Sequence, residues 1–159
     1  MSQTGLLLTL TEPPAGMEEE FNAWYDLEHL PERLSIPGFR SARRWVADGR
    51  PGEGKYLATY ELDSLAVLSS PPYRARFEKP TPWTKRCLDA TVVFKRWACE
   101  QLGNADTHPA ARALMVAFGE KEFKGKALQV RRFRAATGEA IALHELAGPR
   151  PGAYRLYEA

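Results

Sequence analysis

The chain has 159 residues, 44% of them hydrophobic, and its 22 lysines and arginines nearly balance its 20 aspartates and glutamates to give a formal net charge of +2. A chain of this length and apolar content can bury one ordinary core or two small ones built on a common plan. The near balance of charge argues against a surface that follows the phosphates of DNA or RNA, so no nucleic acid partner is expected.

Cysteine usage and the first residues bear on the cellular compartment. Cys87 and Cys99 are too far apart for a Cys-x-x-Cys motif, and the start, M-S-Q-T-G-L-L-L-T-L-T, lacks the charged region and long apolar core of a signal peptide. No apolar run approaches the ~20 residues that a membrane span needs. We therefore expect a cytoplasmic protein without a membrane partner.

The first predicted elements are a strand and a helix. Residues 5–11 (G-L-L-L-T-L-T) are apolar and precede a Glu-Pro-Pro turn signal, which is typical of a buried strand. From residue 17 to residue 30, aromatic residues recur at three- and four-residue spacing after a run of glutamates that favours a helix N-terminus. Pro31 should end or kink this helix near Leu30, with residues 32–34 as a further turn.

The next segments complete a simple α+β pattern. Residues 39–47 and 55–62 read as the strands of a hairpin around the turn-rich residues 48–52. A second helix is predicted across residues 63–77, interrupted at two prolines, and residues 91–97 (T-V-V-F-K-R-W) predict another strand. The order βαββαβ is that of a ferredoxin-like unit, in which two helices cover one face of an antiparallel sheet.

The second half repeats the strands of the first half in order. Its segments A-L-M-V-A-F-G, R-R-F, A-I-A-L-H-E-L and Y-R-L-Y match G-L-L-L-T-L-T, R-R-W, Y-L-A-T-Y-E-L and F-K-R-W. The connectors at residues 120–126 and 147–152 are too short for the helices of the first copy. We therefore expect a ferredoxin-like unit over residues 1–103 and a reduced, mostly β second repeat over residues 104–159; the alternative is a run of similar strands without duplication.

Several motifs together carry a family resemblance. The combination W-Y-D-L-E-H-L-P-E-R-L with P-G-F, then R-R-W, K-Y-L-A-T-Y-E-L, S-P-P-Y-R and P-T-P-W-T, resembles the EthD-like group of the dimeric α+β barrel superfamily over about the first 90 residues. The resemblance implies two ferredoxin-like sheets packed into a barrel, across a dimer interface or between tandem repeats, with a small-molecule cavity between each sheet and its helices. Relatives include polyketide cyclases, dehydratases, decarboxylases, cofactor-free monooxygenases and haem enzymes, so the fold alone does not choose a reaction.

His29 is the leading candidate for chemistry. It lies at the margin of the aromatic stripe of its predicted helix, and an imidazole can take and return a proton near neutral pH. The resemblance implies that this histidine, which precedes a proline by two residues, is an acid/base group. The alternative is a histidine at a helix end that bonds to the last carbonyls and does no chemistry.

Other residues are candidate partners of His29. We expect Tyr60 and Tyr25 to assist in catalysis, and the substrate-binding candidates are Trp24, Glu28, Arg33, Tyr73 and Trp83. Trp83 lies in P-T-P-W-T, which reads as a proline-stiffened loop that could act as a lid. Arg33 could bind a carboxylate or enolate, as could Arg43 and Arg44, although arginines on an antiparallel sheet are more often solvated or paired across strands.

No cofactor or metal is expected. The chain has no G-x-G-x-x-G, P-loop, G-x-S-x-G or H-E-x-x-H motif, and His29, His108 and His144 are widely separated. The predicted function is a cofactor-independent enzyme of the lyase or isomerase type that acts by proton transfer on a small aromatic or polyketide-like molecule. The alternatives are a non-catalytic small-molecule-binding or assembly protein, and a cofactor-free monooxygenase. Because the shortened repeat lacks helices to cover its outer surface, a homodimer is also predicted.

Overall fold

The computed structural model describes residues 3–47, 54–119 and 122–158. In chain order the elements of the first half are β1 (Gly5–Glu12), α1 (Glu18–Trp24), a π-helical turn η1 (Tyr25–His29), α2 (Leu30–Leu34), β2 (Phe39–Val46), β3 (Tyr56–Leu62), a 3-10 helix η2 (Leu65–Ser69), α3 (Pro71–Glu78), α4 (Pro82–Ala90) and β4 (Val93–Gln101). The second half contributes β5 (Ala113–Phe118), β6 (Gln129–Ala135), β7 (Ala140–Leu146) and β8 (Tyr154–Leu156).

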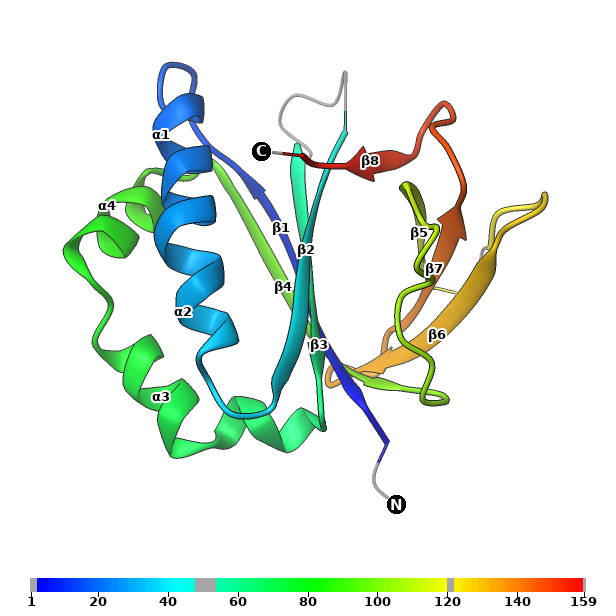
Figure 1. Ribbon diagram of the computed structural model, residues 1–159, viewed down its shortest axis with the longest axis horizontal. Helices are drawn as coiled ribbons and strands as arrows, with labels where there is room; N and C mark the ends of the chain where they lie inside the picture. Colours follow the sequence, from blue (N-terminus) through cyan, green and yellow to red (C-terminus); the bar gives the residue numbers. More distant parts are fainter. Residues whose placement is uncertain (1–2, 48–53, 120–121, 159) are drawn as a thin grey trace.

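The strands close into one antiparallel barrel in the order β1-β3-β2-β8-β5-β7-β6-β4 (Figure 1). The first half contributes the sheet β4-β1-β3-β2 and the second half contributes β8-β5-β7-β6, which is the same order when the four strands of each half are matched in sequence. Two short ladders join the sheets, one from β2 to β8 and one from β4 to β6. The barrel therefore closes within a single chain, and the predicted α+β fold with a helix-poor second half is confirmed.

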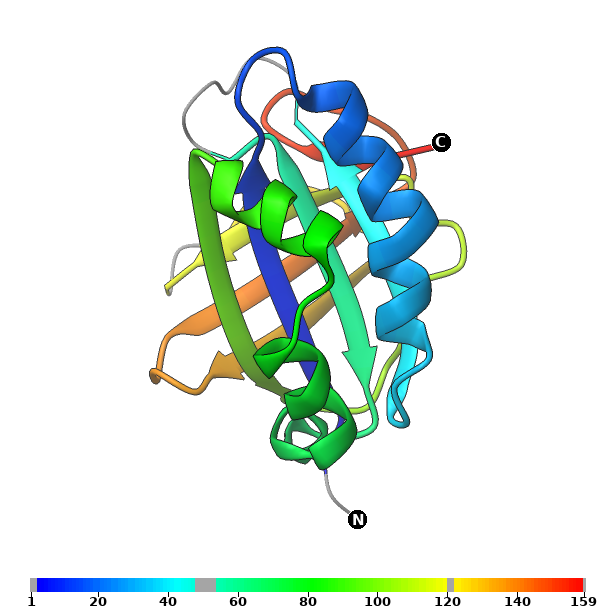
Figure 2. The same cartoon turned by 90° about the vertical axis from the view of Figure 1, so that its left-hand side faces the viewer.

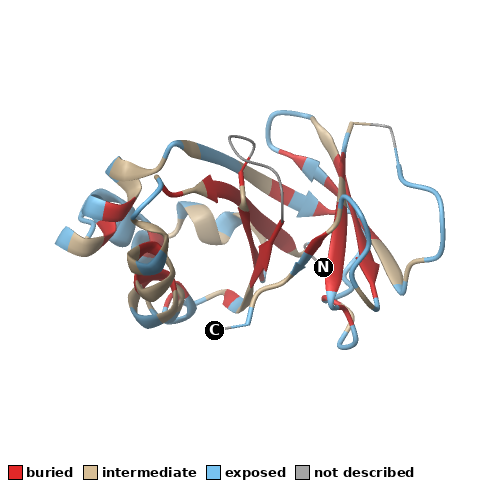
Figure 3. Cartoon of the chain, turned by 90° about the horizontal axis from the view of Figure 1, so that it is seen from above, coloured by how far each residue is buried: buried red, intermediate tan, exposed pale blue. Residues whose placement is uncertain are grey.

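The main core lies between the two sheets, as the view from above shows (Figure 3). Strand alternation sends Leu6, Leu8 and Leu10 of β1 into this core, where Trp45 and Leu143 are also fully buried. The alternate residues of β1 face the helices instead. Every residue of β1 except Glu12 is buried, because the strand is covered on both faces.

The helices form a single layer over the outer face of the first sheet (Figure 2). The helical segment predicted over residues 63–77 with an interruption at two prolines forms η2 and α3, and the break falls at Ser70, which has an extended backbone before the two prolines that start α3. Helix α4 was not predicted. Its start follows Thr81, whose hydroxyl accepts a hydrogen bond from the backbone N–H of Thr84 at 3.1 Å.

The second sheet carries connectors where the first sheet carries helices. Within residues 104–119 and 122–158 the structure has no helix, as the short connectors predict. Phe123 packs edge-on against His144, with ring centroids 5.8 Å apart, and Ala127 packs against the small cluster of Ala113, Met115 and Leu146. The β2–β3 hairpin is also confirmed by its ladder, whereas its expected turn at residues 48–52 lies outside the described residues.

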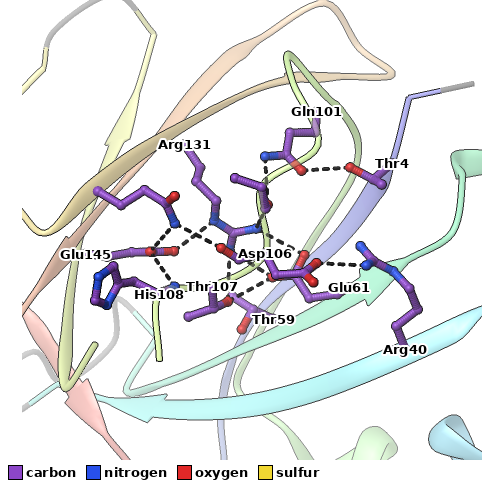
Figure 4. Close-up of polar contacts among 12 residues, drawn as sticks. Thr4, Arg40, Thr59, Glu61, Gln101, Asp106, Thr107, His108, Arg131 and Glu145 are labelled. Atoms are coloured by element: carbon purple, nitrogen blue, oxygen red, sulfur yellow. Dashed lines mark hydrogen bonds and ion pairs between the residues drawn. The ribbon is translucent and has the colours of Figure 1, made fainter. Parts of the chain in front are cut away.

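A buried ion cluster ties the two sheets together at one end of the barrel (Figure 4). The Arg131 guanidinium donates to Glu145 Oε2 from Nε and to Glu61 Oε1 from Nη2, both at 2.8 Å. The side chains of Arg131, Glu61 and Glu145 are 2%, 2% and 0% exposed. Thr107 in the connector between the halves donates to Glu61 as well, at 2.9 Å. The cluster therefore fixes the second sheet and its connector to β3 of the first.

Candidate functional site

A cavity of about 510 Å³ lies between the first sheet and its helices. The resemblance implied a cavity in this place. Its walls combine aromatic rings with a few charged and hydroxyl groups, a composition typical of small-molecule sites. The residues that line it are Leu7, Thr9, Thr11, Trp24, Tyr25, His29, Arg33, Tyr60, Leu68, Tyr73, Arg74, Phe77, Glu78, Leu88, Phe94 and Arg96.

A widened helical turn carries His29 into the wall of this cavity. The backbone N–H of Leu30 donates to the carbonyl of Tyr25, five residues earlier, and the helix then continues through Pro31 to Leu34. His29 is therefore inside a continuous helix and not at its end, which corrects the position expected from the proline. Its Nδ1 is buried and finds no hydrogen-bond partner in the described part of the chain. A histidine held by the final carbonyls of a helix is not what the structure contains.

Two tyrosines lie beside His29. The hydroxyl oxygens of Tyr25 and Tyr60 are 3.2 Å apart and form a buried hydrogen bond in which either group can be the donor. The ring of His29 is 4.9 Å from that of Tyr25 and 6.3 Å from that of Tyr60, centroid to centroid, and both contacts are edge-on. Since a pair of hydroxyls uses only one hydrogen for its mutual bond, the second hydrogen is left for another acceptor.

Burial sets the protonation states of these groups. Desolvation, followed by the positive charges of Arg33 and Arg44, lowers the pKa of His29 well below its ordinary value, so the imidazole is neutral at neutral pH. Desolvation, followed by the neighbouring Tyr25, raises the pKa of Tyr60 well above its ordinary value. The site thus pairs a neutral base with a phenol that keeps its proton.

Arg33 brings a buried positive charge to the cavity one turn beyond His29. The residue is 8% exposed, and its guanidinium lies over the ring of Tyr73 at 5.3 Å from the centroid. Its Nη1 is 3.7 Å from Glu32 Oε1, which is an ion-pair contact but too long for a hydrogen bond. Within the described residues, no atom accepts a hydrogen bond from Nη1.

Buried polar atoms without partners gather at this cavity. Thr9 Oγ1, Thr11 Oγ1, His29 Nδ1 and Arg33 Nη1 are each shielded from solvent and lack a hydrogen bond to the described chain. All four residues line the same cavity. A buried polar group without a partner costs about 1–3 kcal/mol. A ligand that formed hydrogen bonds with these four atoms, after small rotations of their side chains, would remove this cost, so their grouping marks a candidate binding site.

The structure brings together six of the eight predicted site residues: Trp24, Tyr25, His29, Arg33, Tyr60 and Tyr73 line the cavity. Glu28 does not line it. Its carboxylate accepts hydrogen bonds from Thr81 at 2.8 Å and Thr84 at 3.2 Å and so anchors the helix to α4. Trp83 is also outside the lining; it lies in the first turn of α4 and not in a loop, so its expected position as a lid is corrected.

Sequence reasoning missed the two threonines of β1. The period-two alternation of a strand places Thr9 and Thr11 on the same face as Leu7, so the T-L-T pattern held a usable signal. Arg44 has a structural position instead of a ligand-binding one. It donates to Asp26 Oδ1 at 3.1 Å and to Asn22 Oδ1 at 2.7 Å, and its guanidinium is 4.3 Å from the centroid of the Tyr25 ring.

A second hollow, of about 530 Å³, opens between β2 and the connector that precedes β5. It is lined by polar surface groups that include Arg43, His108 and Arg40, the last of which pairs with Asp106 at 2.8 Å. None of the buried atoms without partners belongs to its lining. We therefore place the candidate site in the helix-covered cavity.

The described residues contain no group of three or more histidine, cysteine, aspartate or glutamate side chains that could hold a metal ion. None of the helices in residues 3–47, 54–119 and 122–158 has the length and apolar character needed to cross a membrane.

No protein-family model matches the chain, and no curated protein matches it. Among solved structures, an anthrone oxidase-like protein is similar with a TM-score of 0.61 and 10% sequence identity, over 99% of this chain and 92% of that chain. An ethyl tert-butyl ether D (EthD) family protein from Bacillus halodurans C-125 aligns with a TM-score of 0.44 and 16% identity, over 58% of this chain and 95% of that chain. At 10% identity the full-length similarity shows a common fold, an α+β barrel.

Proposed function

We propose that the helix-covered cavity is the active site of a cofactor-independent enzyme that acts by proton transfer on a small aromatic or polyketide-like molecule. Dehydration, cyclisation, tautomerisation and decarboxylation all begin or end with such a transfer. The observation that carries the proposal is the neutral imidazole of His29, whose buried Nδ1 has no hydrogen-bond partner among the described residues and which lies in an aromatic-walled cavity beside the Tyr25–Tyr60 pair. A buried base with a shifted pKa in a cavity is a common feature of catalytic sites.

Each side chain has a definite role in this scheme. His29 takes a proton from a carbon next to a carbonyl group, and the electron pair left behind moves onto the carbonyl oxygen. The free hydrogen of the Tyr25–Tyr60 pair donates to that oxygen and stabilises the enolate. The imidazolium then returns the proton to a carbon or oxygen of the intermediate. The lowered pKa of His29 makes it a weaker base but a stronger acid, which favours this return.

Trp24 and Tyr73 enclose the ring of the substrate, and Arg33 binds an electron-rich oxygen of it. These roles are supported by the position of all three residues in the cavity lining. Glu28 and Trp83 have no direct part in the scheme, because both lie outside that lining.

The experiment uses anthrone, a planar ketone with an acidic methylene group. Under argon in D₂O, exchange of the methylene protons is followed by proton NMR with and without the protein. We expect protein-dependent exchange that falls ~10²–10⁴-fold in His29→Ala and in His29→Gln, since positioned acid/base groups typically contribute that much. Thermal unfolding of both variants near that of the unchanged protein shows that the fold is kept. A fall of less than ~10-fold in both variants contradicts the role of His29.

Anthrone also distinguishes the two alternative functions, a monooxygenase and a non-catalytic binding protein. A cofactor-free monooxygenase is favoured by the name of the anthrone oxidase-like structure, and it would convert anthrone and O₂ into anthraquinone and water when air is admitted. A non-catalytic binding protein would bind anthrone without catalysing either exchange or oxidation. Proton transfer is the preferred function because the residues in the cavity can perform it without a second reactant such as O₂.

Three further predictions on assembly, location and organisation remain proposals. The chain forms a homodimer. Support comes from the exposed apolar side chains of Val92 and Phe94. They lie around the start of β4, where the described ladders pair the strand with β1 only and leave its other edge open. Light scattering that gives a mass near 17.9 kDa at micromolar concentration would contradict it.

A cytoplasmic location is supported by two free, buried cysteines. Repeats at residues 1–103 and 104–159 are supported by the common strand order.

A further inference from the structure

The guanidinium of Arg33 is buried beside the cavity with hydrogen-bonding capacity unused. Arg33 is 8% exposed, and Nη1 has no hydrogen-bond partner in the described chain. The nearest acid is Glu32, at 3.7 Å, and that carboxylate is also 3.9 Å from Arg76. Glu32 therefore balances part of the charge without satisfying the donors. A buried charged donor without a hydrogen bond is costly, and a bound anion removes that cost.

The charges around the cavity favour an anion as well. Arg33, Arg74 and Arg96 line it, whereas Glu78 is the acidic residue in its lining. Arg96 already donates to the hydroxyl of Tyr73 at 3.0 Å, and Arg74 is exposed. Since Arg33 is buried and has unused donors, a hydrogen bond to its guanidinium would contribute more to the binding free energy of an anion than one to Arg74 or Arg96.

The chemistry of the walls narrows the kind of anion. The guanidinium carbon of Arg33 lies 5.3 Å from the centroid of the Tyr73 ring, and this contact restrains the guanidinium before a ligand arrives. A planar fork of N–H groups matches a carboxylate with two parallel hydrogen bonds. Most of the remaining lining residues are aromatic or aliphatic, and such side chains suit a flat apolar body.

We infer that the cavity takes a planar aromatic carboxylate, with the carboxylate on Arg33 and the ring system between the aromatic walls. The inference rests on the proposed function only for the location of the site, and adds the charge and shape of the ligand. Arg33 follows His29 by four residues on one helix, a spacing at which side chains are ~5–6 Å apart at Cβ. A carboxylate on Arg33 thus brings the carbons next to it within reach of the imidazole.

The test measures binding of two matched compounds, naphthoate and naphthamide, by isothermal titration calorimetry at neutral pH. They have the same ring system and nearly the same shape, but naphthoate carries a charge. We expect the unchanged protein to bind naphthoate about 10-fold or more tightly than naphthamide, because a charge-assisted hydrogen bond to a buried partner has about this effect. The comparison needs no variant, so it does not depend on the folding of one.

Variants then assign the preference to Arg33. Arg33→Met should weaken naphthoate binding by about 10-fold or more and leave naphthamide binding within about threefold, which also shows that the cavity has kept its shape. Arg33→Lys keeps the charge but loses the planar fork, and should fall between the two. Arg76→Met is the matched control, since Arg76 contacts the same Glu32 but does not line the cavity. It should leave both affinities nearly unchanged.

Three results would overturn the inference: naphthamide bound as tightly as naphthoate, a preference for naphthoate that survives Arg33→Met, or no saturable binding of either compound at millimolar concentration. Failure of the proposed function looks different. His29→Gln should keep the preference for naphthoate, so a protein that prefers the anion but does not exchange anthrone protons would support the inference and reject catalysis by proton transfer.

Discussion

The imidazole of His29 stacks on the indole of Trp24, with ring centroids 4.5 Å apart and ring planes inclined by 27°. The two residues are five positions apart, and in a regular α-helix such residues point about 140° away from each other. The π-helical turn Tyr25–His29 places them on one face. Such turns are rare and frequently occur at functional sites.

The stack explains the electrostatics of the site. The Trp24 indole, itself held by a hydrogen bond from Nε1 to the hydroxyl of Thr84 at 3.1 Å, shields one face of the imidazole from water. Desolvation is the largest cause of the lowered pKa of His29. The burial of the His29 ring and its neutral state therefore both follow from the π-helical turn.

Acidification should destabilise the protein partly through His29. The pKa of His29 is lowered in the folded state, so between that value and the ordinary value of about 6.5 the unfolded chain binds more protons. The stability is present above the ordinary value and is lost as pH falls toward the folded value. Urea midpoints at about pH 7 and about pH 5 should therefore differ less in His29→Gln than in the unchanged protein.

His144→Gln is the matched control for this titration. Burial also lowers the pKa of His144, but less strongly, because the charge of Glu122 opposes the shift. This variant should remove a smaller part of the pH dependence. An equal loss of stability on acidification in the unchanged protein and in His29→Gln would show that His29 is not buried as a neutral group.

The Tyr25–Tyr60 pair should show coupling in a double-mutant cycle. Tyr25→Phe or Tyr60→Phe leaves the remaining buried hydroxyl without its partner, which should cost about 1 kcal/mol in the free energy of unfolding. The double variant leaves no hydroxyl behind, so its cost should be smaller than the sum of the two single costs by about 0.5 kcal/mol or more. Additive costs in urea unfolding would contradict a hydrogen bond between these side chains.

The main features of the fold could be predicted from the sequence because they depend on local periodicity. The apolar run in Gly5–Glu12, the aromatic spacing around Trp24 and the matched segments of the two halves each indicate an element directly. Closure of the barrel was harder to predict. It depends on the short ladders from β2 to β8 and from β4 to β6, whose partners are far apart in sequence.

The site was predicted where side-chain direction follows from a regular helix or strand. Trp24 of α1 and Tyr60 of β3 belong to such patterns, and both line the cavity. Glu28 and Trp83 could not be placed in this way. The π-helical turn changes the direction of Glu28, and the Thr81 cap begins a helix at residues that resemble a proline-rich loop.

Gly38→Ala should destabilise the protein through both the backbone and a steric clash. Gly38 has φ +99°, and a Cβ there would clash with Cγ2 of Val67. The left-handed conformation costs an L-residue about 1–2 kcal/mol, and overpacking adds about 1–3 kcal/mol. Gly16 is a matched control with φ +90°, and no side chain or distant backbone of the described residues lies within 4 Å of such a Cβ, so Gly16→Ala should show the first cost alone. Equal effects of the two variants on urea unfolding would rule out the contact with Val67.

The ion cluster between the sheets should be the most sensitive charged feature of the fold. Arg131→Met leaves the carboxylates of Glu61 and Glu145 buried without their shared cation, and losing one partner of a buried ion cluster typically costs about 3–5 kcal/mol. Arg132→Met is the control on the same strand, because Arg132 pairs with Glu122 at 2.6 Å on the exposed surface. That variant should cost less than about 1 kcal/mol in urea unfolding.

A triple variant separates lost packing from stranded charge. If the cost of Arg131→Met comes from the two carboxylates, then adding Glu61→Gln and Glu145→Gln should recover a large part of it, because neutral amides are far less costly to bury than unpaired charges. If the Arg131 side chain contributes mainly by filling space, the triple variant should be no more stable than Arg131→Met. An Arg131→Met protein within about 1 kcal/mol of the unchanged chain would show that the carboxylates find other partners or take up protons, and that the cluster does not hold the two sheets together.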